Sequence, residues 1–583
     1  MHAPVLSSNH GPEPLDLPLK HGLARLANGI SPASMALAYA DWLVHLAVSP
    51  AKQAQLATSG WRKGTAWAHC ATHAWRGDCG RCIEPLPQDK RFAPRQWEES
   101  PPAAALSQAF LLLDRWWNEA ATGVRGVSRH HEELVAFTLR QFVDMWSPSN
   151  FVATNPQVLR ETLASGGANL AGGWCNWWRD ALAVAGGGRP RGVEAFTPGR
   201  TVAVTPGKVV FRNRLVELLQ YEPAGARVQA EPVLVVPSWI MKYYILDLTP
   251  EDSLVRYLVS QGHTVFMLSW RNPAGADRDL GMEDYLQLGP LAALRAVRRL
   301  CGGARVHAAG YCLGGTLLAI AAAVLGRGAD DSLRTVTLLA GQVDFDQPGE
   351  LGLFIDESQI AFLEDLMADR GYLDGRQMAG AFQLINSKDL VWSKLVHEYL
   401  MGARTPVGAM GAWNADATRL PARMHSEYLR RLYLRNDLAQ GRYPAAGQWV
   451  RLSDIAVPLF VVGTERDHVS PWRSVYKIHG LAHGPVTFVL SSGGHNVGIV
   501  NAPAGPLAHP QASYRSAAHG PAQAPADPQD WLAAAAVVQG SWWPCWHEWL
   551  VRHSSGRRRA RQVRGLVEDG RPLLAPGRYV HQT

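Results

Sequence analysis

Short runs of β-branched residues alternate with helix-length segments along the last two thirds of the chain, and this pattern constrains the fold more than any other feature. Seven runs typical of strands follow Thr201: Val209–Phe211, Val233–Val236, Thr264–Ser269, Arg305–Ala309, Thr335–Leu339, Leu459–Val462 and Val486–Leu490. Strands that alternate with helices form a mainly parallel sheet with helices on both faces. The sequence therefore predicts an α/β domain over residues 191–553.

The first 190 residues lack this alternation. Apolar residues recur there at helical spacing in three segments, Met35–Val48, Ala103–Ala120 and Glu132–Met145. Glycines and a proline at 186–190 then give the chain the composition of a linker. We therefore expect residues 1–190 to form a mostly helical N-terminal domain.

Two further segments depart from the α/β pattern. Between about 344 and 436 the strand-like runs stop, and the sequence becomes helical and rich in aromatic residues. A helical insertion at this point of an α/β domain is expected to form a lid over the functional site of the domain. Residues 554–583 begin with the run Arg557-Arg558-Arg559 and are predicted to form a basic tail.

The composition of the chain excludes several classes of protein. Hydrophobic residues make up 47% of the 583 residues and charged residues 18%, as in a globular protein rather than a disordered one. The net charge of +7 is accompanied by no zinc-finger, helix-turn-helix or RNP-like pattern, so no nucleic-acid partner is expected. The N-terminus lacks the features of a secretory signal, and no apolar run is long enough to span a membrane. We therefore expect a cytoplasmic protein.

Seven cysteines, an odd number scattered over a long chain, indicate reduced thiols rather than a disulfide scaffold. One of them lies in the pattern Gly310-Tyr311-Cys312-Leu313-Gly314, between a predicted strand and the apolar helix predicted at Thr316–Leu325. This is the context of a nucleophile elbow, the strained turn that presents a reactive side chain in the α/β-hydrolase fold. The N-terminus of the following helix favours a thiolate, and the Leu313 amide is placed to bind a developing oxyanion.

The partners of Cys312 follow from their order along the chain. In this fold an acid and then a histidine come after the nucleophile, each on a loop that follows a late strand. Asp467 follows the strand Leu459–Val462, and His495 follows the strand Val486–Leu490. Such residues are usually only solvated when taken singly, but here both stand in the correct order. The sequence thus predicts a Cys312–His495–Asp467 triad.

The remaining site residues are expected near the strand Val233–Val236. The loop after this strand should supply a second oxyanion donor, for which the backbone amide of Ile240 is the candidate. Candidate pocket residues are Tyr243, Tyr244, Asp247 and His468. Core packing is the alternative for the two tyrosines, because tyrosines after a strand are more often buried there.

Blocks of residues from about Asp89 to Val580 resemble the polyhydroxyalkanoate synthases. These blocks are Ser147–Phe151, Ala153–Pro156, Lys242–Leu248, Ser269–Pro273, Gly310–Gly314, Trp413–Asp416, Asp467–His468, Pro471–Trp472, Gly494–His495, Gly540–Pro544 and Pro576–Val580. The last two are similar to the single-subunit, class I type. Ser238, where a second proline is frequent, and the residues after His495 depart from the family pattern.

The resemblance implies an acyltransferase that polymerises 3-hydroxyacyl-coenzyme A (CoA) with release of CoA and without a cofactor. Cys312 would be the acylated nucleophile, His495 its general base and Asp467 the third member of the triad. The resemblance also implies acyl groups of about three to five carbons, such as 3-hydroxybutyryl. It further implies a homodimer at the surface of polymer granules.

Two other functions stay open from the residues alone. The same fold and triad would serve a thioesterase or a polymer hydrolase, and the fold alone would serve a non-catalytic granule-surface scaffold. The cysteine and the extent of the resemblance favour the synthase over a hydrolase. A complete triad favours an enzyme over a scaffold.

A possible zinc site lies outside the catalytic pattern. The spacing of four residues could satisfy a tetrahedral zinc ion: Cys70, His73, Cys79 and Cys82. Incidental thiols are the more frequent explanation, so no metal is expected.

Two stretches are rich in tryptophan, Trp174–Trp178 and Trp542–Trp549. We expect both to pack in a core, because large aromatic side chains are usually buried. An exposed patch that contacts polymer or a second subunit is the alternative.

Overall fold

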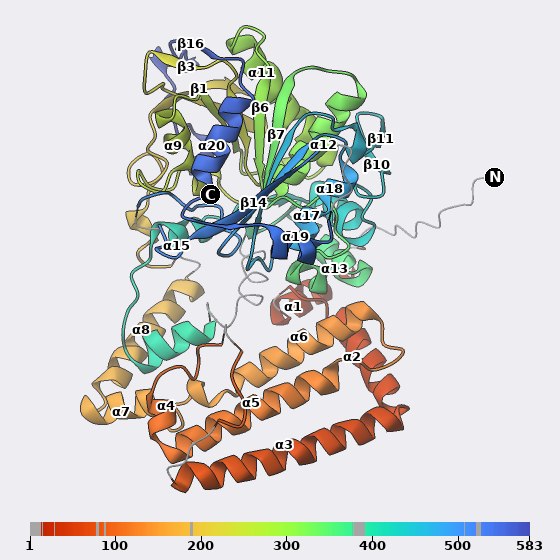
Figure 1. Ribbon diagram of the computed structural model, residues 1–583, viewed down its shortest axis with the longest axis vertical. Helices are drawn as coiled ribbons and strands as arrows, with labels where there is room; N and C mark the ends of the chain where they lie inside the picture. Colours follow the sequence, from red (N-terminus) through yellow and green to blue (C-terminus); the bar gives the residue numbers. More distant parts are fainter. Residues whose placement is uncertain are drawn as a thin grey trace, which may run out of the picture. The chain divides into compact units, whose positions relative to one another are not determined.

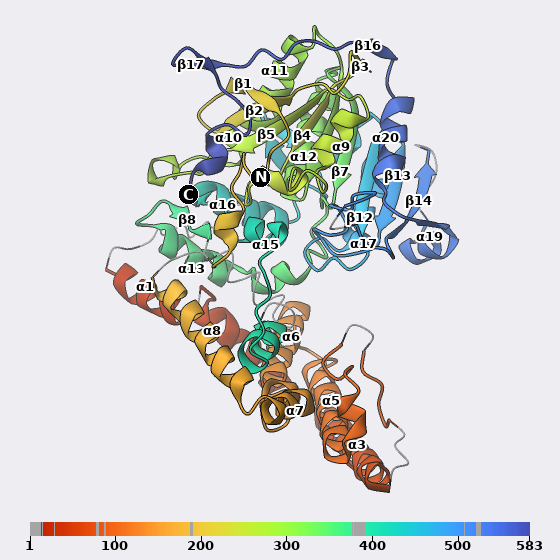
Figure 2. The same cartoon turned by 90° about the vertical axis from the view of Figure 1, so that its left-hand side faces the viewer.

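The computed structural model describes residues 13, 15–27, 29–76, 81–86, 89–186, 190–375, 377, 391–505, 508–520 and 526–583. The chain divides into two compact units. The larger unit combines residues 1–29, 192–379 and 407–583, and the smaller combines residues 30–191 and 380–406. Figures 1 and 2 show the elements of each unit from two directions.

A ten-stranded sheet is the centre of the larger unit within the described residues (Figure 1). Its strands are β1 (Gly207–Arg212), β2 (Val216–Tyr221), β4 (Val233–Val236), β5 (Val265–Trp270), β6 (Val306–Tyr311), β7 (Leu333–Leu339), β12 (Leu459–Thr464), β13 (Val486–Ser491), β14 (Ser513–His519) and β15 (Val537–Gln539). They lie in the order β1-β2-β5-β4-β6-β7-β12-β13-β14-β15. The six from β5 to β13 run parallel, and two strands at each edge pair antiparallel. This mainly parallel sheet confirms the predicted fold class.

Helices cover both faces of the sheet. The longer ones are α11 (Ala292–Leu300), α12 (Leu313–Arg327) and α20 (Trp543–Arg552). Helix α13 (Glu357–Met367) packs instead against α1 (Leu17–Leu26) and α16 (Ala422–Tyr428). A β-carbon on Gly310 of β6 would meet Gly315 of α12, so this side of β6 faces α12. Thr337 of β7 accepts a hydrogen bond from Trp546 of α20 and lies beside Ala309 in the strand register. Because successive residues of a strand point to opposite faces, α12 and α20 lie on opposite sides of the sheet.

The tryptophans of α20 and its N-terminus are in the core, as expected. Trp542, Trp543 and Trp546 are at most 1% exposed. Their indole N–H groups donate to the carbonyl oxygens of Gly498 and Ile499 and to the Thr337 hydroxyl, respectively. The helix is therefore fixed to the sheet by polar as well as apolar contacts.

The smaller unit is helical within its described residues. It contains α2 (Pro32–Ala47), α3 (Pro50–Arg76), α4 (Gln96–Glu99), α5 (Pro101–Ala121), α6 (Arg129–Met145), α7 (Pro156–Ala164), α8 (Ala168–Ala185) and the π-helix η8 (Leu395–Leu400). The three segments predicted from apolar spacing correspond to α2, α5 and α6. Its core includes Phe92, Trp97 and Phe110, and α5 packs between α3 and α6. Figure 1 shows these helices side by side in orange and red.

The tryptophans of α8 are not in a core, so that expectation was wrong. Trp174, Trp177 and Trp178 are 63%, 42% and 51% exposed. The rings of Trp174 and Trp177 stack with their centroids 5.1 Å apart. Residues three and four apart share one face of a helix. The tryptophan rings on this face of α8 therefore pack against one another rather than against a buried partner.

The expected domain boundaries differ from the observed units at two places. The segment before residue 30 belongs to the larger unit, where Lys20 lies 2.8 Å from Asp365. The segment expected as a lid, 344–436, is divided, because residues 380–406 belong to the smaller unit. There, Asp180 of α8 pairs with Lys394 and Arg404. Residues 376 and 378–390 of this segment lie outside the described residues.

The C-terminal residues 554–583 are part of the larger unit rather than a separate basic tail. Strand β16 (Arg557–Arg559) pairs antiparallel with β3 (Arg227–Gln229). The backbone carbonyl of Gln582 accepts a hydrogen bond of 2.6 Å from Lys242, and its side-chain oxygen accepts one of 3.0 Å from the Asn272 amide. A run of arginines predicts a solvated tail only where no strand edge is available to pair with it.

No helix in the described parts of the chain is both long and apolar enough to traverse a bilayer.

Candidate active site

Cys312 stands at the junction of β6 and α12, where it is the N-cap residue of the helix. Its backbone has φ 54° and ψ −128°, a conformation that costs a residue with a β-carbon about 1–3 kcal/mol. The two glycines of the pattern make this turn possible. A β-carbon on Gly310 would lie 2.5 Å from the Cα atom of Gly315, and one on Gly314 would lie 2.3 Å from the carbonyl oxygen of Val236.

His495 and Asp467 meet each other in the loops that follow β13 and β12. The Nδ1 atom of His495 lies 2.8 Å from Oδ2 of Asp467. The carboxylate also accepts hydrogen bonds from the Thr464 hydroxyl at 2.7 Å and from the backbone amides of Val469 and Ser470 at 2.9 and 2.7 Å. Burial opposes ionisation of Asp467, but His495 and these donors hold its pKa below the ordinary value.

The imidazole of His495 also reaches Cys312, with which it forms a side-chain hydrogen bond. Because Nδ1 faces Asp467, the nitrogen that faces the thiol is Nε2. Burial lowers the pKa of His495, but the charges of Asp467 and Cys312 outweigh burial and raise it well above the ordinary value. The structure thus brings together the three residues predicted as a triad, and this set can move a proton between sulfur and imidazole.

The loop after β4 lies against the turn of Cys312, since the carbonyls of Val236 and Pro237 are the groups that a β-carbon on Gly314 would strike. Thr418 forms two hydrogen bonds with this loop. Its hydroxyl donates to the Trp239 carbonyl at 2.6 Å, and its amide donates to the Ile240 carbonyl at 3.1 Å. Leu313 begins α12, whose first N–H groups have no partner within the helix. The two segments predicted to supply oxyanion donors therefore lie side by side.

Known proteins are similar to this chain over most of its length. Residues 10–52 match the family model "Poly-beta-hydroxybutyrate polymerase N terminal", residues 88–258 match "Poly-beta-hydroxybutyrate polymerase (PhaC) N-terminus", and residues 231–502 match "alpha/beta hydrolase fold". A poly(3-hydroxyalkanoate) polymerase of Methylorubrum extorquens is 42% identical over 518 residues, which cover 88% of this chain and 84% of that protein. The chain belongs to the polyhydroxyalkanoate synthase family.

A second relative supports the same assignment. The poly(3-hydroxyalkanoate) polymerase subunit PhaC of Cupriavidus necator is 38% identical to this synthase over 500 residues, which cover 84% of this chain and 83% of that protein. Among solved structures, a monoacylglycerol lipase of Paleococcus ferrophilus matches with 14% identity and a TM-score of 0.32, over 58% of this chain and 100% of the lipase. Membership in the family makes the chain an acyltransferase-type enzyme of polyhydroxyalkanoate formation.

Three candidate pocket residues of the synthase are buried behind the loop after β4. Tyr243 is 2% exposed, and Tyr244 donates a hydrogen bond of 3.0 Å to Asp416. Asp247 accepts hydrogen bonds from the hydroxyls of Thr205 and Ser253 at 2.5 and 2.7 Å, and burial raises its pKa. The hydrogen bonds of Tyr244 and Asp247 therefore stabilise the conformation of the loop after β4.

His468, the fourth candidate, is exposed beside Asp467. Its side chain is 63% exposed, and its Nδ1 atom lies 3.9 Å from Glu350. His468 is therefore open to solvent, whereas the neighbouring Asp467 side chain is fully buried.

Tyrosines that the sequence did not single out lie close to Cys312. Tyr311 donates a hydrogen bond of 2.6 Å to Asn496, and its ring centroid is 5.6 Å from that of His495. Tyr428 ends α16 (Ala422–Tyr428), and Tyr433 lies in the π-helix η9 (Leu429–Leu434) that continues it. Burial raises the pKa of Tyr428 and Tyr433, and the charge of Cys312 adds to the effect. Tyr311 stood inside the elbow pattern, whereas the only signal of Tyr428 and Tyr433 in the sequence was the aromatic content of the expected lid.

The possible zinc residues lie in the smaller unit. Cys70 and His73 are on α3, Cys82 follows this helix, and Cys79 lies outside the described residues. The described residues contain no cluster of three or more His, Cys, Asp or Glu side chains that could hold a metal ion.

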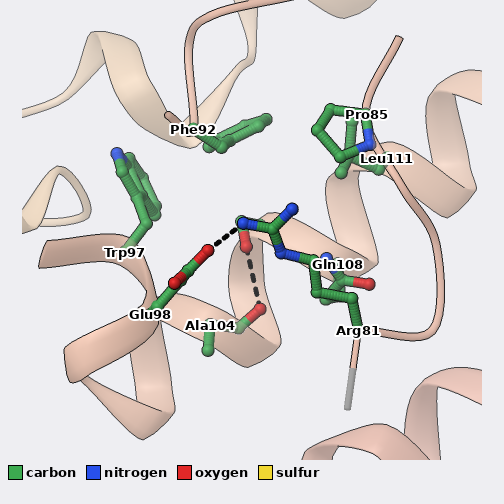
Figure 3. Close-up of a pocket in the computed structure, with 9 residues that line it drawn as sticks. Arg81, Pro85, Phe92, Trp97, Glu98, Ala104, Gln108 and Leu111 are labelled. Atoms are coloured by element: carbon green, nitrogen blue, oxygen red, sulfur yellow. Dashed lines mark hydrogen bonds and ion pairs between the residues drawn. The ribbon is translucent and has the colours of Figure 1, made fainter. Parts of the chain in front are cut away.

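A cavity of about 260 Å³ also belongs to the smaller unit, and none of the predicted site residues lines it. Figure 3 shows Arg81 in this cavity, paired with Glu98, with Trp97 and Phe92 nearby. Its walls come from α4, α5 and the segment before α4, whereas the three residues of the triad belong to the larger unit.

Proposed function

We propose that this synthase polymerises 3-hydroxyacyl-CoA through a thioester on Cys312, with His495 and Asp467 as its catalytic partners. The observation that supports this most strongly is the chain of hydrogen bonds from Asp467 through His495 to a cysteine at a strained turn. Cysteine suits the reaction because transfer from one thioester to another keeps the acyl group activated, whereas an ester on serine would lose that activation.

In the loading step, the proton of the Cys312 thiol passes to Nε2 of His495, and the sulfur attacks the carbonyl carbon of the CoA thioester. The bond between that carbon and the CoA sulfur breaks, and the imidazolium returns the proton to the departing thiolate. The amides of Leu313 and Ile240 bind the oxyanion, and Asp467 stabilises the imidazolium. This reaction uses no cofactor, since CoA is only the leaving group.

In the elongation step, the 3-hydroxyl of an acyl group attacks the thioester, so that an ester bond forms and the thiol is released. Both carboxylate oxygens of Asp467 already accept hydrogen bonds: Oδ2 from Thr464 and His495, and Oδ1 from two backbone amides. We therefore propose that His495 accepts the proton of the attacking 3-hydroxyl and that Asp467 acts only through the imidazole.

Exclusion of water distinguishes a synthase from a thioesterase, because water would hydrolyse the same thioester. Cys312 is only 9% exposed, and the aromatic side chains of Tyr428 and Tyr433 lie near it. This environment favours polymerisation over hydrolysis. The intact triad argues against a non-catalytic scaffold.

Purified protein supplied with 3-hydroxybutyryl-CoA tests the three functions together. Release of CoA with recovery of polyester supports the proposal. Release of CoA with free 3-hydroxybutyrate identifies a thioesterase, and wild-type protein that releases no CoA is a scaffold. The Cys312→Ala variant provides the background rate.

The preferred acyl group is proposed to be short, at about three to five carbons, by analogy with the class I type that the sequence resembles. Each methylene added to a pocket changes discrimination by only about 1 kcal/mol, so the preference is expected to be graded. Kinetics with four-carbon and ten-carbon 3-hydroxyacyl-CoA measure it. A higher kcat/KM for the ten-carbon substrate would overturn the short-chain assignment and leave the triad untouched.

We further propose that the protein is a cytoplasmic homodimer that works at the surface of polymer granules. The exposed rings of Trp174, Trp177 and Trp178 support an apolar contact of this kind. Replacing all three with serine should reduce the fraction of protein that sediments with washed granules. Unchanged sedimentation and an unchanged oligomeric state would remove α8 from both contacts.

A further inference from the structure

Two buried side chains near Cys312 carry hydrogen-bonding atoms that no described residue satisfies. His425 of α16 is 2% exposed, and neither of its ring nitrogens has a partner. Trp239, in the loop after β4, is 1% exposed, and its Nε1 atom has none. Unpaired polar atoms destabilise a protein interior, so each one requires an explanation, and a ligand that completes the hydrogen bonds is one.

Both side chains touch Tyr428. The ring centroid of Tyr428 is 5.2 Å from that of His425 and 6.1 Å from that of Trp239. Tyr428 in turn lies within the electrostatic reach of Cys312. The loop of Trp239 starts at Val236, whose carbonyl adjoins the turn of Cys312. His425 and Trp239 therefore belong to an aromatic cluster around Tyr428, next to the turn of the cysteine that would carry the acyl chain.

The chemical form of these groups matches the oxygens of the substrate. Burial lowers the pKa of His425 to about 3, so its ring is neutral and offers one N–H donor and one nitrogen acceptor. The Trp239 indole offers one donor. A 3-hydroxyl both donates and accepts, which suits a neutral imidazole, and an ester carbonyl only accepts, which suits an indole N–H.

Two details of the chain add to this pattern. The hydroxyl of Ser238, next to Trp239, is a fourth buried atom of this region without a partner among the described residues. The helix of His425 continues directly into the π-helix η9. Such wide helical turns are frequent at functional sites, where they interrupt regular packing.

We propose that His425 and Trp239 bind the hydroxyl and ester oxygens of the substrate and so select 3-hydroxyacyl groups over plain acyl groups. The inference rests on the proposed function, because it takes Cys312 to be the acylated residue. A site built to hydrogen-bond a hydroxyl rejects an analogue that lacks it, since its buried polar atoms then stay unpaired.

The test compares two substrates that differ only in the hydroxyl. Single-turnover release of CoA is measured with 3-hydroxybutyryl-CoA and with butyryl-CoA. The readout is the rate for 3-hydroxybutyryl-CoA divided by the rate for butyryl-CoA. In His425→Leu and Trp239→Phe this ratio should fall at least about tenfold. Loading of butyryl-CoA should fall much less. His425→Asn, which keeps a donor and an acceptor, should preserve most of the ratio.

His479→Leu is the matched control. His479 is a partly buried histidine whose pKa burial also lowers, but its ring packs on Tyr476, Phe488 and His519. The wild-type ratio should persist in this variant.

The outcomes separate this inference from the proposed function. Wild-type protein that loads neither substrate refutes the acyl-enzyme itself. Wild-type protein that loads both equally, or variants that lose both rates by the same factor, refute only the selection by His425 and Trp239. Equal loss would indicate a structural role, and near-ultraviolet circular dichroism of each variant verifies that the fold is intact.

Discussion

Replacing Gly314 with alanine tests whether the close approach of the elbow and the loop after β4 forms the oxyanion site. A β-carbon there would lie 2.3 Å from the Val236 oxygen and 2.5 Å from the Pro237 oxygen. Both distances are about 1 Å shorter than ordinary contact. Because both oxygens belong to the backbone, no side chain can rotate to relieve the overlap, and the two segments must separate by about 1 Å.

A displacement of about 1 Å between catalytic groups costs roughly 100-fold in rate. Overpacking costs about 1–3 kcal/mol of stability, and the higher helix propensity of alanine offsets about 1 kcal/mol of this. We therefore expect a kcat/KM about 100-fold lower and an unfolding free energy lower by about 0–2 kcal/mol. CoA release and urea denaturation measure the two quantities.

Gly328→Ala, at the C-terminal end of the same helix α12, is the control. A β-carbon on Gly328 would meet the Leu325 oxygen at 3.5 Å, an ordinary contact. Turnover of this variant should match the wild type. If Gly314→Ala also turned over at the wild-type rate, the reasoning from the close approach would be refuted.

Three further predictions concern the triad. Cys312→Ala should abolish CoA release without loss of the fold, and Cys312→Ser should retain little activity; wild-type rates from the serine variant would contradict the thioester argument. His495→Ala should prevent acylation of Cys312, whereas Asp467→Ala should allow some acylation and mainly block elongation, as radiolabelled acyl-enzyme would show. Because the pKa of His495 is raised in the folded state, its contribution to stability is complete below its ordinary pKa of about 6.5 and is lost as the pH rises through the folded value. The difference in unfolding free energy between wild type and His495→Asn should therefore become smaller as the pH rises through the folded-state pKa of His495. A difference that stays constant with pH would mean that this pKa is not raised.

Much of the fold was predictable because the buried parallel strands are short, β-branched runs with few polar residues. The antiparallel strands β2, β14 and β15 were missed. The sequence Val216–Tyr221 mixes Glu217 and Gln220 with apolar residues, and β14 contains Arg515 and His519. Glu217 of β2 is buried and pairs with Arg212, a contact that the sequence does not reveal. Strand β14 is partly exposed, so its composition approaches that of a loop. Helix α3 was missed because Gly60 and Gly64 interrupt its pattern.

The triad was predictable because chain order and strand position suffice to identify its members. The surroundings of Cys312 were not predictable in the same way. Tyr428 and His425 reach the site from the inserted segment, more than a hundred residues after the elbow, and no spacing rule connects them to it. Trp239 stood in a recognised loop, but only the packed structure shows that its indole nitrogen is unpaired.

The contacts of Gln582 have a practical consequence for protein engineering. This residue holds the side chain of Lys242 and the backbone of Asn272, and Lys242 is two residues from Ile240. A tag or fusion partner joined directly after Thr583 would therefore disturb the contacts of Gln582 and, through Lys242, the segment that carries a proposed oxyanion donor. Immobilisation through the C-terminus needs a flexible spacer, so that the anchor does not become a mechanical load on the reaction centre.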